Sequence, residues 1–156
     1  EKIAPMDLFD EVMKVFQPLA TQRKVQIMRE LTLAQSLEID ADRALLQQAL
    51  YNLLDNAVKY SGDSPEIQIK AHIEGTKVFI SICDNGPGIS KFHQKRIFQK
   101  FYRIPTENIH DVKGFGLGLF YVKSICDAHR WKISIDPSHA GGSAFILELP
   151  IKKRIK

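Results

Sequence analysis

Three polar side chains share one face of a predicted helix in the first half of the sequence. Asn52, Asn56 and Lys59 stand at positions i, i+4 and i+7, and at about 100° per residue this spacing confines them to one narrow sector. The opposite sector is apolar and should pack on a sheet; it contains Leu46, Leu50, Leu53 and Ala57. Asparagine is worse than alanine in a helix by about half a kcal/mol, so two on one face indicate either a shared chemical task or an ordinary solvated face.

A second cluster is the run DNGPGI at residues 84–89, which directly follows a predicted strand. The carboxylate of Asp84 would lie at the end of that strand, where it could accept a hydrogen bond from an exocyclic amine. Gly86 and Gly88 would let the backbone approach a flat ring such as adenine. The same string also suits a tight turn that binds nothing, so by itself it leaves both interpretations open.

A third cluster is the run GFGLGL at residues 114–119, which opens a predicted helix. Glycines at a helix N-terminus expose backbone N–H groups and the positive end of the helix dipole, which together suit phosphate oxygens. A flexible loop explains the same residues equally well. No strand leads into these glycines, and the GxGxxG and Walker A spacings are absent, which argues against a Rossmann or P-loop site.

Apolar periodicity and turn residues predict the elements that would position these clusters. We expect helices over residues 7–23, 40–60, 91–100 and 117–129, and strands within 24–39 and over 67–73, 78–82, 131–135 and 144–149. Asp7 and Asp40 are the expected N-caps of the first two helices. The core face of the first helix should comprise Leu8, Val12, Val15, Phe16 and Leu19. Residues 101–116 show no period and predict a long loop, a type of segment that is usually functional.

This order of elements predicts an α+β protein rather than a doubly wound parallel sheet. Helices combined with a mixed, mostly antiparallel sheet and few βαβ alternations indicate a two-layer α/β sandwich. With 156 residues, 44% of them hydrophobic and 26% charged, we expect one globular domain over residues 1–150 and a basic tail over 151–156.

The same composition narrows the classes of function. The net charge of +4 is matched by four basic residues in the tail, so we expect a solvated end and no nucleic-acid partner. No apolar run approaches the roughly 20 residues of a membrane span, and the N-terminus lacks the regions of a signal peptide, so we expect this piece to be soluble. Cys83 and Cys126 form no CxxC or CxxH pair and are expected to be buried thiols in a reducing compartment.

Taken together, the three clusters resemble the N, G1 and G2 boxes of the nucleotide-binding fold shared by histidine kinases, DNA gyrase B, the MutL repair protein and the ninety-kilodalton heat-shock chaperone. The boxes read NLLDNAVKY, DNGPGI and GFGLGL. Residues 97–103, IFQKFYR, resemble the F box of the kinase branch, and residues 142–145 are similar to the family's last glycine box. The likeness spans nearly the whole chain and implies a Bergerat-type fold in the ATP-binding catalytic domain of a sensor histidine kinase.

The resemblance implies ATP and Mg²⁺ as cofactors, with Asn56 as the metal ligand. Lys59 would contact phosphate, Tyr60 would pack near the base, and Asp84 would bind the adenine amine. Further residues implied to contact the nucleotide are Asn52, Gly86, Gly88, Ile89, Phe101, Gly114, Gly116, Leu117, Gly118, Leu119 and Ser143. The catalytic residues implied are Asn52, Lys59 and Arg103, with Phe98, Phe101 and Arg103 in a mobile ATP lid and Arg103 as a possible γ-phosphate contact.

Asn52 separates two mechanisms within this superfamily. The hydrolytic relatives place a glutamate at that position as a general base for water, and an amide cannot take that proton. The resemblance therefore implies phosphoryl transfer to a histidine with slow hydrolysis. Only His110 has an acidic successor, and it lies in the predicted lid loop, so we attribute that pair to coincidence and expect the acceptor outside this chain.

The expected partners are therefore the dimerisation domain that carries the phosphoacceptor histidine and a cognate response regulator. The parent is expected to be a membrane-anchored homodimer with this domain in the cytoplasm, and the isolated chain is not expected to autophosphorylate. The alternatives are a degenerate domain that binds without transfer, an ATP-gated clamp like the gyrase relatives, and nucleic-acid binding through the tail. One departure from the family concerns Arg130-Trp131, where a Gly-Gly pair is usual; we expect Trp131 to pack on the core.

Overall fold

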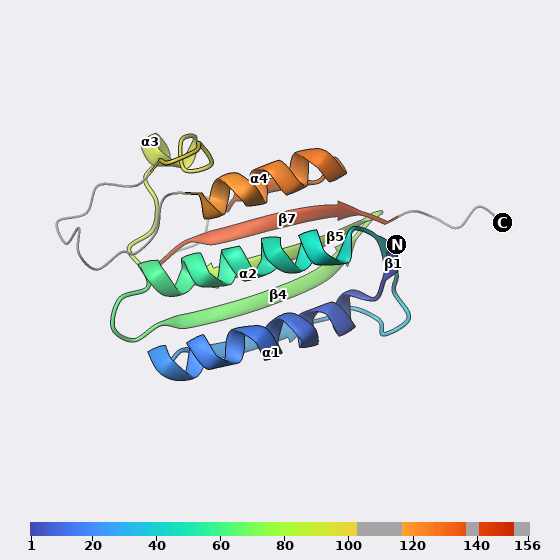
Figure 1. Ribbon diagram of the computed structural model, residues 1–156, viewed down its shortest axis with the longest axis horizontal. Helices are drawn as coiled ribbons and strands as arrows, with labels where there is room; N and C mark the ends of the chain where they lie inside the picture. The colour runs from blue at the N-terminus through green and yellow to red at the C-terminus, as the bar shows by residue number, and fades with distance from the viewer. Residues whose placement is uncertain (103–116, 137–140, 152–156) are drawn as a thin grey trace.

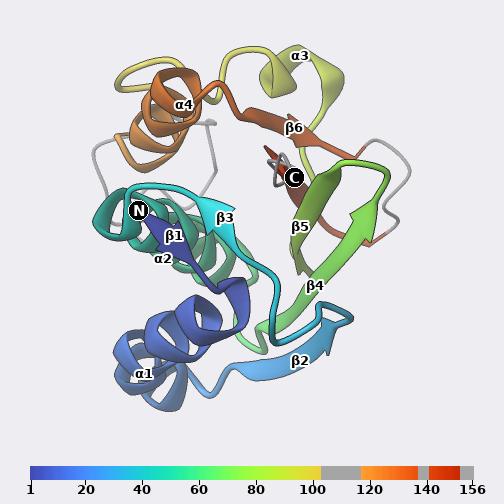
Figure 2. The same ribbon diagram turned by 90° about the vertical axis from the view of Figure 1, so that its right-hand side faces the viewer.

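The computed structural model describes residues 1–102, 117–136 and 141–151, which form two layers (Figures 1 and 2). One layer is a five-stranded sheet in the order β2-β4-β5-β7-β6. The other contains the long helices α1 (Pro5–Arg23), α2 (Arg43–Tyr60) and α4 (Gly118–His129). Figure 2 shows these helices against one face of the sheet. The predicted two-layer α/β sandwich is confirmed.

The sheet is mixed and mostly antiparallel, as predicted. Its strands are β2 (Gln26–Leu31), β4 (Glu66–Glu74), β5 (Lys77–Asp84), β6 (Lys132–Ile135) and β7 (Ala144–Pro150). β2 and β4 run parallel, whereas the β4–β5, β5–β7 and β6–β7 pairs are antiparallel. Two further short strands, β1 (Lys2–Ile3) and β3 (Ile39–Asp40), form a separate antiparallel pair.

The core lies between the sheet and the helices. Alternate residues of β4 and β5 point inward, among them Ile67, Ile69, Ile80 and Ile82, each about 1% exposed. The predicted apolar sector of α2 meets them, because Leu46, Leu50, Leu53 and Ala57 are all buried. The opposite, outer face of the sheet carries the intervening side chains, such as His72 and Phe79, whose rings stack at 5.4 Å.

The start of α1 differs from the prediction. The helix begins at Pro5, with Ala4 as its N-cap, so Asp7 lies inside the first turn and the prediction of Asp7 as the cap is wrong. Proline suits the first helical position because its missing N–H would have no partner there. Val15, predicted on the core face, is 67% exposed, because the buried sector is turned toward Phe9, Phe16 and Ala20.

Three other helix boundaries also differ from the prediction. Asp40 belongs to β3, and the N-cap of α2 is Asp42, whose side chain accepts a hydrogen bond of 3.0 Å from the N–H of Leu45. The helix predicted over 91–100 is only α3 (Lys91–Gln94), followed by turns. Helix α4 begins at Gly118, one residue later than predicted.

In the turn after α4, larger residues stand where the resemblance leads one to expect a glycine pair. Arg130 adopts a left-handed conformation with φ 58°, which glycine adopts more easily, and Trp131 is buried as expected and stacks on His129 at 4.1 Å. Cys83 and Cys126 are free and buried, which confirms the predicted buried thiols. Within the parts of the chain that the structure describes, no helix has the length and apolar character needed to cross a bilayer.

Candidate functional site

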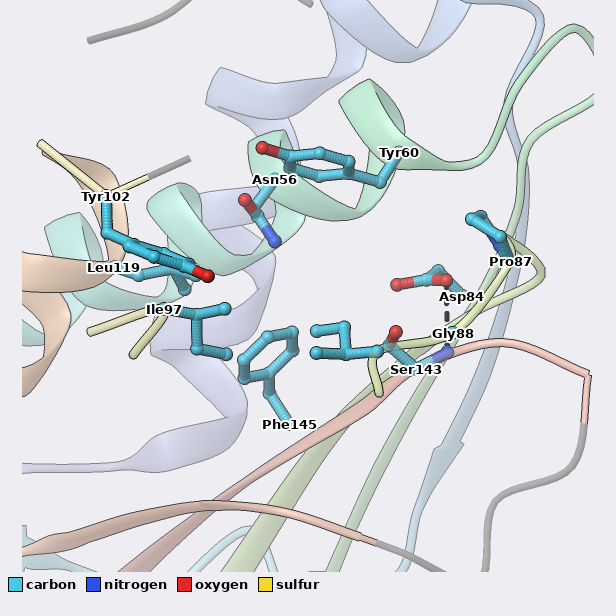
Figure 3. A pocket seen from close by; sticks show the side chains of 11 residues that line it. Asn56, Tyr60, Asp84, Pro87, Gly88, Ile97, Tyr102, Leu119, Ser143 and Phe145 are labelled. Atoms are coloured by element: carbon cyan, nitrogen blue, oxygen red, sulfur yellow. Dashed lines mark hydrogen bonds between the residues drawn. The ribbon is translucent and has the colours of Figure 1, made fainter. Parts of the chain in front are cut away.

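A pocket lies between the C-terminal half of α2 and the ends of β5 and β7 (Figure 3). Its lining residues are Asn56, Tyr60, Asp84, Pro87, Gly88, Ile89, Ile97, Tyr102, Leu119, Ser143 and Phe145. Asp84 and Ser143 lie on one side of it, and the apolar side chains of Ile97, Leu119 and Phe145 lie across from Asp84. An apolar cavity with a few convergent polar groups is the usual form of a small-molecule site.

Asp84 is the buried acidic group of this pocket, with 5% of its surface exposed. It is the last residue of β5, and its Oδ1 accepts hydrogen bonds from the N–H groups of Gly86 (2.9 Å) and Ser143 (3.2 Å). These two bonds fix the orientation of the carboxylate, which projects into the pocket (Figure 3). A fixed carboxylate at this place can accept a hydrogen bond from a ligand amine.

The turn after Asp84 packs so closely on its neighbours that glycine is required. A Cβ at Gly86 would lie 2.3 Å from the carbonyl oxygen of Tyr60, at the end of α2. Gly88 has φ +80°, and a Cβ at Gly142, before β7, would lie 1.8 Å from the carbonyl oxygen of Asp84. The backbone of the turn is therefore in close contact with the backbone at the end of α2, and the start of β7 is in close contact with the backbone of Asp84.

Asn85 ties the same turn to the start of β4. Its side-chain Oδ1 accepts from the N–H of Glu66, and its Nδ2 donates to the carbonyl oxygen of Ser64, both at 3.0 Å. The DNGPGI run is thus a tight turn, and at the same time it presents a carboxylate to a pocket. The two interpretations that the sequence left open are compatible with each other.

The predicted polar face of α2 is brought only partly to the pocket. Asn56 lines the pocket and points its amide into it (Figure 3), whereas Asn52 and Lys59 are outside the lining. Lys59 forms an ion pair with Asp55 on its own helix, with Nζ to Oδ2 at 2.8 Å. This pairing was not predicted, although the spacing of four residues is the usual one for an ion pair on a helix.

The other predicted site residues divide into three groups. Tyr60, Gly88, Ile89, Leu119 and Ser143 line the pocket together with Asp84. Gly86 stands behind the carboxylate, and three others lie outside the lining: Phe101, which is 63% exposed, Leu117 at the N-cap of α4, and Gly118 at its first turn. The predictions that fall outside the described residues concern Arg103, Gly114, Gly116, His110, most of the segment predicted as an ATP lid, and the tail from residue 152.

Four lining residues were not predicted as site residues: Pro87, Ile97, Tyr102 and Phe145. Ile97 and Tyr102 belong to the IFQKFYR run, and Phe145 alternates inward along β7, so each had a signal in the sequence. The sequence does not show the tertiary contacts that bring these separate segments together around one cavity.

The donor chemistry of the pocket fits a metal that arrives with its own ligands. Within the described residues, no group of three or more His, Cys, Asp or Glu side chains could hold a metal ion. Mg²⁺ prefers hard oxygen ligands and commonly keeps waters and substrate phosphates, so a single amide oxygen such as that of Asn56 is compatible with it. The residues present therefore fit an ion bound together with a phosphorylated ligand.

A family model described as histidine kinase-, DNA gyrase B-, and HSP90-like ATPase matches residues 41–153. The chain belongs to this family. The resemblance stated from the three boxes is thereby confirmed, and the matched region includes the described pocket from Asn56 to Phe145.

The curated relatives of the chain include sensor proteins. The sensor protein RprX of Bacteroides fragilis (strain YCH46) is 44% identical over 117 residues, which make up 74% of this chain and 22% of RprX. The chain thus spans about a fifth of the length of that relative.

Solved structures of the family share the fold. The catalytic domain of histidine kinase ThkA superposes with a TM-score of 0.83 at 29% identity, covering 96% of this chain and 94% of that domain. ThkA has also been solved in complex with the response regulator TrrA. Full-length ShkA in complex with AMPPNP gives a TM-score of 0.80 at 26% identity, covering all of this chain and 32% of ShkA.

Proposed function

We propose that this chain binds Mg·ATP in the described pocket and transfers the γ-phosphate to a histidine on a dimerisation domain outside it. The observation that carries the proposal is the fixed carboxylate of Asp84 in a pocket with apolar walls, which Asn56 enters from α2. A flat ring with an exocyclic amine fits this arrangement, since the amine can donate to Asp84 while the ring contacts apolar side chains.

The nucleotide would lie with its base near Asp84 and its phosphates toward α2. The amide oxygen of Asn56 would hold Mg²⁺, which when bound neutralises charge on the β- and γ-phosphates. Lys59 would contact phosphate after leaving Asp55. The structural similarity to ShkA, which was solved with AMPPNP, supports an adenine nucleotide as the ligand.

Transfer rather than hydrolysis is proposed because of Asn52. This amide stands one helical turn before Asn56 and cannot act as a general base toward water. The chain would therefore contribute positioning and charge neutralisation, and the acceptor imidazole would be supplied by the partner domain.

The proposal extends to the parent protein. We assign residues 1–150 to the catalytic domain and 151–156 to a solvated basic tail without a nucleic-acid partner. The parent would be a membrane-anchored homodimer with this domain on the cytoplasmic side. A response regulator would receive the phosphoryl group, and the complex of the similar kinase ThkA with TrrA supports that step.

The decisive assay is formation of acid-labile phosphohistidine. The chain is mixed with Mg·[γ-³²P]ATP and the separately prepared dimerisation domain of its parent, and label is expected on that domain but not on the chain alone. Asn56→Ala should abolish the label. Gln48→Ala, an exposed amide on the same helix, should leave it unchanged and serves as the matched control. The proposal would be contradicted if the cognate dimerisation domain stayed unlabelled, or if the chain alone hydrolysed ATP rapidly.

A further inference from the structure

Two adjacent residues of α3 each contact a different lining residue of the pocket without lining it themselves. Nε2 of Gln94 donates a hydrogen bond of 2.8 Å to the carbonyl oxygen of Ile89, in the turn that follows β5. Nδ1 of His93 contacts the hydroxyl of Tyr102. Ile89 and Tyr102 both line the pocket. The short helix α3 therefore connects two walls of the site from outside it.

His93 is a well-held partner for Tyr102. Its N–H donates to the carbonyl oxygen of Ser90 at 3.0 Å, and its own carbonyl accepts from Arg96 at 2.9 Å and Ile97 at 3.0 Å. The ring of Phe92 lies edge-on to its imidazole, with centroids 5.2 Å apart at 83°. The backbone turn and this ring contact fix where the imidazole stands.

The ring of Tyr102 is partly buried against the core and its hydroxyl contacts His93. Its backbone N–H donates to the carbonyl oxygen of Gln99 at 3.1 Å, and the preceding residue, Phe101, turns outward with φ 65°. The rings of His93 and Tyr102 are tilted by 46° with centroids 5.9 Å apart, so they do not stack. The contact between phenol and imidazole is therefore what joins the two side chains.

We infer that His93 is a positioning residue for nucleotide binding: it holds the ring of Tyr102 in place as a wall of the pocket. The inference rests on the proposed function, because it names a determinant of the same site. The imidazole of His93 meets the pocket through Tyr102, because His93 is itself absent from the lining and its bond to the lining residue Ile97 uses the backbone carbonyl. Replacing its imidazole should therefore weaken the nucleotide complex only as far as it releases that ring.

The test is a set of variants assayed by ATP displacement of a fluorescent ATP analogue in the presence of Mg²⁺. His93→Leu and Tyr102→Phe should each weaken ATP about five-fold, the effect of one hydrogen bond. The double variant should be no weaker than the single ones, because both remove the same contact. His93→Asn should bind nearly as wild type, since its amide oxygen can take the place of Nδ1. His72→Leu, on the outer face of the sheet, is the matched control.

A second readout follows Tyr102 directly and needs no nucleotide. In protein labelled with 3-fluorotyrosine, the ¹⁹F resonance of residue 102 is identified by its loss in Tyr102→Phe. It should shift in His93→Leu and not in His72→Leu, with thermal unfolding confirming that each variant is folded.

An unshifted resonance, or losses of affinity that add in the double variant, would overturn the role of His93. If wild type binds ATP and His93→Leu binds equally well, only this inference fails. If wild type does not bind ATP at all, both the proposed function and this inference are wrong.

Discussion

At the scale of single residues, Asp84 is the group that we propose selects the base. Its Oδ1 accepts from two backbone N–H groups, and the carboxylate projects into the pocket. Asp84→Asn can keep the acceptor for those N–H groups, but it replaces the other oxygen with an NH₂ donor that would face the adenine amine. We expect ATP affinity to fall by about 5- to 150-fold, which corresponds to a cost of about 1–3 kcal/mol for an unmatched polar pair.

The measurement is a titration of wild type and Asp84→Asn with the same fluorescent ATP analogue. Asp63→Asn changes an exposed carboxylate in the loop after α2 and should leave the affinity unchanged. Equal affinity of the Asp84→Asn variant and wild type would mean that the base binds elsewhere.

A second prediction at this scale concerns Lys59, because the phosphate that we propose as its ligand competes with Asp55 for its amine. Its ion pair with Asp55 competes with the proposed phosphate contact for the same ammonium group. An ion pair of this spacing contributes about 0.3–0.5 kcal/mol, so Asp55→Asn should tighten Mg·ATP by about two-fold. Isothermal titration at low salt checks the change.

Helix α4 offers a matched control for this prediction. Lys123 and Asp127 form an ion pair with the same spacing and the same 2.8 Å distance. Asp127→Asn should therefore leave ATP binding as it is. Weaker binding in Asp55→Asn would show that this carboxylate belongs to the site rather than competing for Lys59.

At the scale of elements, the pocket depends on the contact between the end of α2 and the turn after β5. A Cβ at Gly86 would meet the backbone of Tyr60 at 2.3 Å, and backbone cannot yield as a flexible side chain can. Gly86→Ala should move the turn away from α2, lower the free energy of unfolding by about 1–3 kcal/mol, and weaken ATP more than ten-fold. Denaturant unfolding and the nucleotide titration measure the two effects.

The control for that prediction is Gly75→Ala at the tip of the β4–β5 hairpin. A Cβ there meets nothing within 4 Å, although φ is +62°. Its cost should be confined to backbone strain, and ATP affinity should not change. A Gly86→Ala variant that binds ATP as wild type does would show that the turn and α2 are not held at a fixed separation.

The elements were predictable to the extent that local pattern determines them. The hairpin of β4 and β5 and the apolar sector of α2 follow from alternation and helical periodicity, and the structure confirms both. Helix starts were less predictable, because several residues near one terminus can cap it: Asp42 caps α2 where Asp40 was expected, and Pro5 starts α1 before Asp7. The exposure of Val15 depends on how α1 is rotated against the core, which its own sequence does not determine.

The candidate site was predictable only in part, because local sequence pattern does not determine tertiary contacts. Asn56, Asp84 and Ser143 stand in recognisable boxes, and the structure brings them to one pocket. Tyr102 and Phe145 join them through tertiary packing, and the contact of His93 with Tyr102 links residues nine apart through a turn with no regular period. The pairing of Lys59 with Asp55 was also not predictable from the sequence, because each residue alone is typical of a solvated helix face.

At the scale of the whole molecule, Cys126 reports how tightly the helices close on the sheet. Burial raises the pKa of its thiol to about 11, and its side chain is fully buried. Because the thiolate is the reactive form, its fraction at pH 8 is smaller in the folded chain than in the unfolded one. In a Cys83→Ala background, iodoacetamide at pH 8 should leave Cys126 unmodified until denaturant unfolds the chain.

Mass spectrometry along a denaturant series checks this prediction, because Cys126 is then the only cysteine in the chain. The midpoint of modification should coincide with the midpoint of unfolding followed by circular dichroism. Rapid modification without denaturant would mean that α4 opens locally from the core.

The central claim is that a nucleotide occupies the pocket between α2 and the turn after β5. The most direct measurement is an NMR titration of the ¹⁵N-labelled chain with Mg·AMPPNP. We predict that the backbone amides of Gly86 and Ser143 and the side-chain amide of Asn56 shift in a saturable manner. Those of His72 and Ser81, on the outer face of the sheet, should stay in place. Saturable shifts on the outer face alone, or none at millimolar nucleotide, would contradict the account.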